Sequence, residues 1–181
     1  MNKVISILRG INVSGHNKIS MSELKSLYEE LKFKNVTTYI QSGNVIFSTE
    51  QTDFTVLSKQ IEKIISQKFK FAVPVILRNI NELQAIVNTN PFLKIKDIDI
   101  EKLHVSFLSN YPTKDYLEKI KTYHHEPDVF IIKGKEAFVF CPNGYGKTKF
   151  TNIFFETKLK VTATTRNWRT INELLRIASA I

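Results

Sequence analysis

The chain contains a single cysteine, Cys141, among 181 residues, so no disulfide bond can form within it. It also lacks any apolar run near the ~20 residues that a membrane-spanning helix requires. The apolar run at its beginning is interrupted by Ser6 and is too short for a signal peptide. Because chains poor in cysteine are typical of reducing compartments, we expect a soluble, cytoplasmic protein that makes no contact with a membrane.

Patterns that hold metal ions or build catalytic centres are missing as well. None of the cysteine and histidine spacings of zinc sites occurs, and the neighbours His124 and His125 would point apart in a regular element. We therefore expect no metal and no cofactor. His16, in a polar loop, and Cys141 are weak candidates for acid–base or nucleophilic chemistry. Whether the protein is an enzyme is left open.

Acidic residues are few relative to basic ones, which gives a net charge of +9. The stretch from Lys133 to Arg176 holds nine basic and three acidic residues and so carries +6. Such a region attracts phosphates over a long range, although a merely solvated basic surface has the same composition. The candidates for binding an anion or a nucleic acid are Lys147, Lys149, Lys158, Lys160, Arg166 and Trp168. Trp168 is placed either to stack on a base or to dock its helix into the core.

Hydrophobic periodicity predicts one order of elements in both halves: strand, helix, strand, strand, helix, strand and a further helix. The expected strands are 3–8, 36–40, 45–48, 74–77, 103–108, 128–132, 137–141 and 161–164. The expected helices are 20–31, 54–69, 79–87, 113–123, 149–159 and 168–180. This order is that of the ferredoxin-like βαββαβ fold, or α/β plait. We therefore predict an α+β protein with two such lobes, 1–90 and 101–181, each followed by an extra helix, and a linker at 91–100.

A sequence echo also favours two related halves. Arg78-Asn-Ile-Asn-Glu-Leu83 returns as Arg169-Thr-Ile-Asn-Glu-Leu174, at an offset of 91 residues (169 − 78). We interpret this echo as the trace of an internal duplication.

Two polar loops are expected to meet at one edge of the first sheet. In a ferredoxin-like lobe the end of the first strand lies beside the turn between the second and third strands. The residues brought together there are Arg9, Gly10, Asn12, Gln41, Ser42, Gly43 and Asn44. Amide side chains donate and accept hydrogen bonds, and glycine allows a ligand to approach closely. These residues are candidates for a ligand or partner site; the alternative is that they satisfy the backbone of their own loops.

A further loop, Pro142 to Thr148, ends in Gly146-Lys147-Thr148, as a phosphate-binding loop does. That pattern requires another glycine five residues before Gly146, where the chain has Cys141. Nucleotide hydrolysis is therefore not expected. A nest of backbone amides that binds an anion and a flexible basic loop are the two interpretations left.

Four blocks of sequence resemble a known family. They are Leu8-Arg-Gly-Ile-Asn-Val13, Gln41-Ser-Gly-Asn-Val-Ile-Phe47, Asn90-Pro-Phe92 and Thr164-Thr-Arg-Asn-Trp168. These blocks are similar to the signature blocks of the bacterial domain-of-unknown-function family 1697. The resemblance implies two α/β-plait lobes and brings no established activity. One departure is Ser14-Gly15, where the family usually has two glycines.

Taken together, the sequence favours a binding protein without chemistry of its own, with weak affinity for nucleic acid or another polyanion through its basic C-terminal lobe. One alternative is a small-ligand binder or enzyme that uses Arg9, Asn12, Gln41 and Asn44. A second is a protein-interaction scaffold. An aromatic platform for RNA is not indicated on the first strand, because both faces of 4–8 are largely apolar and neither carries an aromatic residue. The oligomeric state is not indicated.

Overall fold

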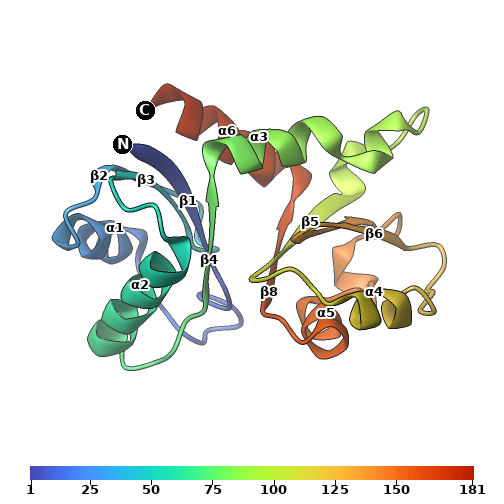
Figure 1. The fold of residues 1–181 in the computed structure, drawn as a ribbon, viewed down its shortest axis with the longest axis horizontal. Helices are drawn as coiled ribbons and strands as arrows, with labels where there is room; N and C mark the ends of the chain where they lie inside the picture. Colours follow the sequence, from blue (N-terminus) through green and yellow to red (C-terminus); the bar gives the residue numbers. More distant parts are fainter. The chain divides into compact units, whose positions relative to one another are not determined.

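The computed structural model describes all residues from 1 to 181 and contains two four-stranded antiparallel sheets and six α-helices (Figure 1). The predicted α+β class with two ferredoxin-like lobes is confirmed. By internal contacts the chain divides into two compact units. Unit 1 comprises Met1–Gln84 and Glu173–Ile181, and unit 2 comprises Ala85–Asn172.

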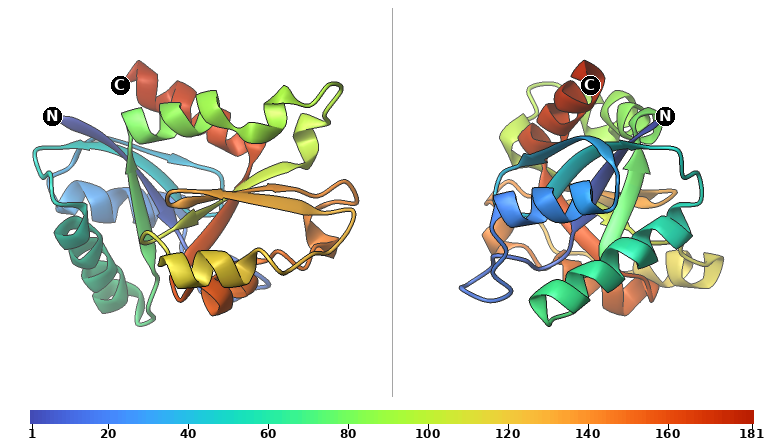
Figure 2. Two further views of the ribbon diagram at one scale, coloured as in Figure 1. Left: turned by 45° about the vertical axis from the view of Figure 1, so that its right-hand side comes forward. Right: turned by 90° about the vertical axis from the view of Figure 1, so that its left-hand side faces the viewer.

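Unit 1 is built on a sheet with the strand order β2-β3-β1-β4. Its elements are β1 (Asn2–Leu8), α1 (Met21–Glu30), β2 (Lys34–Tyr39), β3 (Asn44–Thr49), α2 (Phe54–Phe69) and β4 (Val75–Asn79). Figure 2 shows α1 and α2 on one side of the sheet, where Leu27 and Ile61 pack against Val4 and Phe47 in a continuous core. α1 begins with a capping box: the Ser20 hydroxyl accepts from the Glu23 N–H at 3.2 Å, and the Glu23 carboxylate accepts from the Ser20 N–H at 3.3 Å.

Unit 2 repeats this arrangement with the strand order β6-β7-β5-β8. Its elements are β5 (Leu103–Leu108), α4 (Lys114–Ile120), β6 (Val129–Lys133), β7 (Glu136–Phe140), α5 (Asn152–Leu159) and β8 (Ala163–Asn167). Helices α4 and α5 cover one face, and Ile120, Phe150 and Phe155 fill the core beneath them. In this strand order β6 lies at one edge of the sheet.

Three element boundaries in unit 2 differ from the prediction by three residues each. α4 ends at Ile120 and not near 123, because the Thr122 hydroxyl bonds the Lys119 carbonyl at 2.9 Å and competes with the helix. α5 begins only at Asn152, after Thr151 has capped it. β8 runs from Ala163 to Asn167, three residues beyond the predicted end.

The two remaining helices cross the division between the units. α3 (Ile80–Thr89) and α6 (Trp168–Ala180) each begin directly after the last strand of a sheet, and each has residues in both units. The predicted linker at 91–100 contains the short 3₁₀ helix Pro91–Lys94 and belongs to unit 2. The continuous domains 1–90 and 101–181 thus stay a prediction, since the contact-based units are not continuous along the chain. None of the helices is both long and apolar enough to cross a membrane.

The sequence echo is out of step with the fold by three residues. Arg78 lies in β4, whereas its predicted counterpart Arg169 lies in α6. The residue that matches Arg78 in position is Arg166, because each is the last but one of its strand and pairs with the central strand of its sheet. The structural offset at this point is therefore 88 residues (166 − 78) and not 91.

Candidate functional site

The two polar loops of unit 1 lie side by side, as the topology requires. The Leu8 N–H donates to the Gly43 carbonyl at 2.9 Å, and the Asn12 side chain donates to the Gln41 carbonyl at 2.9 Å. Gly43 is needed at this contact, since a Cβ there would lie 2.7 Å from Ile11 Cδ1, and its φ is +81°.

The side-chain amides of Asn12 and Asn44 form hydrogen bonds with the backbone of their own loops. Asn12 also donates to the Ile19 carbonyl and accepts from the Ile19 N–H, both at 2.9 Å. Asn44 is fully buried and donates to the Tyr39 carbonyl and the Ser42 hydroxyl, both at 3.0 Å. These contacts match the alternative in which the side chains hold the loops together. Arg9, Gly10 and Ser42 are half-buried and Gln41 is exposed.

The four lysines predicted to bind anions fall into two groups. Lys147, Lys149 and Lys160 are exposed and form no ion pair. The Lys158 ammonium is instead engaged with Tyr123: it donates to the hydroxyl at 2.7 Å and lies 4.1 Å from the ring centroid.

Arg166 and Trp168 are buried, with 8% and 6% of their surfaces exposed, so they do not belong to an exposed basic surface. Arg166 donates to the Thr164 hydroxyl and the Thr165 carbonyl. Burial lowers the pKa of its guanidinium to about 10. The position of Trp168 at the start of α6 matches the prediction that this side chain docks its helix.

In the loop at 142–148 the backbone groups form hydrogen bonds with one another in tight turns. The Gly144 N–H donates to the Cys141 carbonyl at 2.9 Å, and the Lys147 N–H donates to the Gly144 carbonyl at 3.1 Å. These amides are not available to an anion, and α5 begins several residues later. Burial raises the pKa of the Cys141 thiol to about 11, with the charge of Asp128 acting in the same direction. The thiol is therefore protonated near neutral pH and is a poor nucleophile.

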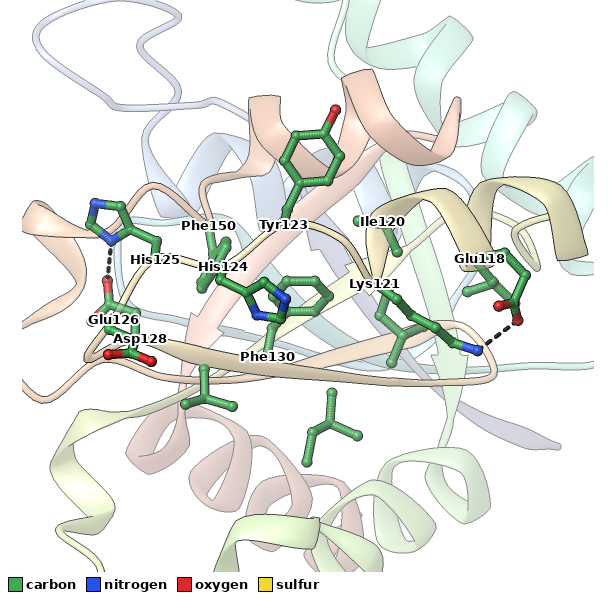
Figure 3. A pocket seen from close by; sticks show the side chains of 14 residues that line it. Glu118, Ile120, Lys121, Tyr123, His124, His125, Glu126, Asp128, Phe130 and Phe150 are labelled. Carbon is green, nitrogen blue, oxygen red and sulfur yellow. Dashed lines mark hydrogen bonds and ion pairs between the residues drawn. The ribbon is translucent and has the colours of Figure 1, made fainter.

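A groove in unit 2 was not anticipated. Its volume is about 530 Å³, within the range of small-molecule sites (roughly 300–1,000 Å³). It lies between β6 and the segment that runs from α4 through the following loop (Figure 3). Its apolar walls are Leu117, Ile120, Val129, Phe130, Ile131, Ile132 and Phe150. Successive strand residues point to opposite faces, so a groove lined by all four residues 129–132 must run along the edge of the strand.

Polar side chains lie at both ends of this groove, with His125, Glu126 and Asp128 at one end and Glu118 and Lys121 at the other (Figure 3). The Asp128 side chain is only 4% exposed, and its Oδ2 lies 3.5 Å from His125 Nδ1, which itself has no hydrogen bond. Glu118 and Glu126 also line the groove, while the single ammonium there, Lys121, pairs with Glu118 at 2.6 Å. Three carboxylates and one ammonium give this groove a charge of −2 with histidines neutral, on a chain of +9.

The sequence pattern predicts a strand at 128–132 but gives no sign of what lies beside that strand, so it does not reveal this groove. One signal concerned the strand itself: Val129-Phe-Ile-Ile132 is apolar at every position, which is typical of a strand covered on both faces. In the structure β6 is an edge strand, and Val129 and Ile131 remain 45% and 37% exposed. The groove has the space and the apolar walls to bury apolar groups, and Asp128 can place a negative charge beside a cation. The described side chains contain no cluster of histidine, cysteine and acidic residues able to hold a metal ion.

Comparison with known proteins identifies a family and a fold. No curated protein matches the chain significantly. A solved structure of the conserved bacterial protein SP0830 from Streptococcus pneumoniae is similar, with a TM-score of 0.74, 21% sequence identity and 98% of each chain covered. At that identity the likeness shows the fold. The sequence model of the family described as "Protein of unknown function (DUF1697)" matches residues 1–138. The chain therefore belongs to the DUF1697 family.

Proposed function

We propose that this protein is a non-catalytic binding protein and that its ligand site is the groove between α4 and β6. The observation that carries the proposal is the groove itself: about 530 Å³ of space with apolar walls and one nearly buried carboxylate, Asp128. Binding sites combine apolar walls with a few fixed polar groups that set orientation. Apolar contact then provides affinity, and Asp128 selects a cationic group.

The state of the reactive side chains supports binding without chemistry. The Cys141 thiol is buried and stays protonated near neutral pH. Burial also lowers the pKa of His104. Its ring stacks on the ring of Tyr145, with 4.7 Å between the ring centroids. Neither group is presented to the groove.

A fragment screen followed by two-dimensional amide NMR tests the proposal. Fragments with a branched aliphatic or aromatic body and an amine should shift the amide resonances of residues 117–132 and of Phe150. The same fragments should bind equally well to Ile153→Lys, because Ile153 is 68% exposed and does not line the groove. A screen in which no fragment shifts these amides, or in which the shifts fall elsewhere, would contradict the proposal.

A second candidate function is weak binding of nucleic acid or another polyanion through unit 2. It is favoured by Lys147, Lys149 and Lys160, which are exposed and make no ion pair. Phosphate contacts release counterions and carry no sequence information. Fluorescence anisotropy on random RNA and DNA oligomers in about 50 mM salt should then show weak binding that the double variant Lys147→Glu/Lys149→Glu abolishes for every sequence alike. Binding that survives this charge reversal would exclude these lysines.

We further propose that the protein is bacterial and cytoplasmic and that its two halves arose by internal duplication. One cysteine in 181 residues and a bacterial structural relative support a bacterial, cytoplasmic protein. The common strand order of the two sheets, together with the matching positions of Arg78 and Arg166, supports an internal duplication.

A further inference from the structure

The outer strands of the two sheets differ in how they are protected. In unit 1 the edge strand β2 carries Lys34, Asn35, Thr37 and Thr38, and an irregularity interrupts its pairing between Lys34 and Thr37. Polar residues and bulges of this kind prevent an edge from pairing with another strand. In unit 2 the edge strand β6 is regular along its whole length and apolar from Val129 to Ile132. This edge has none of those protections before Lys133.

The backbone of β6 has pairing capacity that no other element uses. β6 is hydrogen-bonded to β7 in an unbroken antiparallel register from Val129 to Lys133. In such a pair, every second residue of an edge strand directs its N–H and C=O away from the sheet. No backbone group of another element bonds to β6 on that side. The groove runs along the same strand, because side chains on both faces of β6 line it.

The groove has the size and chemistry of a site for an extended peptide. Five residues of β6 correspond to roughly 17 Å of strand at about 3.4 Å per residue, which five residues of a partner can match. Alternate side chains of an added strand would pack on opposite faces, beside Phe130 and Ile132 on one and Val129 and Ile131 on the other. Asp128 and Glu126 provide negative charge at one end of the groove, while Glu118 is paired with Lys121, so a basic side chain complements the Asp128 end.

We propose that β6 is the docking edge for an extended segment of a partner protein, which adds a strand to the sheet of unit 2. The segment has apolar residues at alternating positions and a lysine or arginine whose cation pairs with Asp128. This inference rests on the proposed function, since it names the class of ligand for the same groove.

The experiment selects peptides from a phage-displayed library of random dodecamers on the full-length protein. Enriched sequences should contain alternating apolar residues and a lysine or arginine, and should shift the amides of Val129–Lys133. Each selected peptide is then synthesised with single N-methyl groups along its backbone. Methylation at every second position should weaken binding at least tenfold, because it removes the donors that face β6, while methylation between them should have little effect.

One conservative substitution in the protein, Asp128→Asn, tests the proposed ion pair. Asp128→Asn should weaken a lysine-containing peptide at least tenfold and leave the norleucine version of the same peptide unaffected. A peptide that binds in the groove without the alternating effect of N-methylation overturns strand addition. If Asp128→Asn changes the affinity of both peptides equally, the peptide lysine does not pair with Asp128.

Two further outcomes separate this inference from the proposed function. If fragments bind in the groove but no peptide is enriched, the inference fails and the proposed function stands. If neither binds, both fail.

A dimer of the chain is a further possible outcome. If sedimentation shows a dimer that Ile131→Lys abolishes, then β6 pairs with a second copy of the chain, and the proposal of a partner peptide is overturned.

Discussion

The side-chain nitrogen of Asn12 lies 2.9 Å from the backbone carbonyl oxygen of Gln41, and this hydrogen bond ties the loop after β1 to the turn between β2 and β3. The same amide group makes two further hydrogen bonds with the backbone of Ile19. One side chain therefore joins three points of unit 1. Its role at this edge is structural, and the loops that it joins position the end of β1.

Replacing Asn12 by glycine should destabilise the protein more than the same change at Asn17. Both residues have positive φ, 54° and 49°, which glycine adopts without strain. Asn12 loses three hydrogen bonds, whereas Asn17 loses one, to the Gly10 carbonyl. At about 0.5–1.5 kcal/mol for each hydrogen bond, the free energy of unfolding in urea should be lower for Asn12→Gly by about 1–3 kcal/mol. Equal losses of stability in the two variants would show that the Asn12 hydrogen bonds do not hold these loops together.

Gly43→Ala should be far more harmful than Gly15→Ala. Their φ angles are nearly the same, +81° and +80°, so the conformational strain on alanine, about 1–2 kcal/mol, is common to both. At Gly43 the new methyl group would meet Leu8 Cβ at 2.8 Å, while at Gly15 nothing lies within 4 Å. Overpacking of this kind costs a further 1–3 kcal/mol or so. Thermal unfolding of the pair measures the difference, and similar midpoints would show that the loops separate easily.

Acidification should weaken the wild-type protein partly through His104. Burial lowers the pKa of its imidazole below the ordinary value of 6.5. Because the folded state holds the neutral form, its contribution to stability is present above pH 6.5 and is lost as the pH falls through the lowered pKa. In His104→Gln this contribution is missing, so the free energy of unfolding should fall less steeply between pH 7 and pH 5 (roughly the range in which histidine titrates). Parallel pH profiles would contradict the assignment.

Cys141 should resist alkylation in the native protein. Its thiol is buried and its pKa is raised to about 11, so little thiolate exists at pH 8 (slightly below the ordinary cysteine pKa of about 8.5). Iodoacetamide should modify the residue only after urea unfolds unit 2, as intact-mass spectrometry would show. Rapid modification of the native protein would indicate an accessible, reactive thiol.

Much of the fold could be predicted from periodicity and capping residues. The pattern from Phe54 to Phe69 predicts α2 over its whole length, and Ser20, Thr113 and Asn167 cap helices as their sequence positions indicate. Sequence periodicity does not predict which side chains tertiary packing buries. The burial of Arg166 depends on the strand in which it sits and on hydrogen bonds to Thr164 and Thr165, so composition alone placed it wrongly among exposed basic residues.

The candidate site could not be predicted for a related reason. A groove depends on what lies beside a strand, and the sequence of β6 does not show that its outer edge is left uncovered. The early end of α4 at Ile120, which leaves residues 121–126 as a loop beside β6, was also outside the reach of periodicity. By contrast, the loops that hold Asn12 and Asn44 lie together as predicted, because strand order alone brings them to one edge of the sheet.

The central claim, that the groove beside β6 is the ligand site, is tested most directly by one comparison of affinities. The tightest groove-binding fragment is titrated by NMR into the wild type, Ile131→Lys and Ile153→Lys. Both isoleucines are exposed apolar residues of unit 2, at 37% and 68%, but only Ile131 lines the groove. The account predicts at least a tenfold loss for Ile131→Lys, about 1.4 kcal/mol or more, and wild-type affinity for Ile153→Lys. Equal affinity of all three proteins would contradict it.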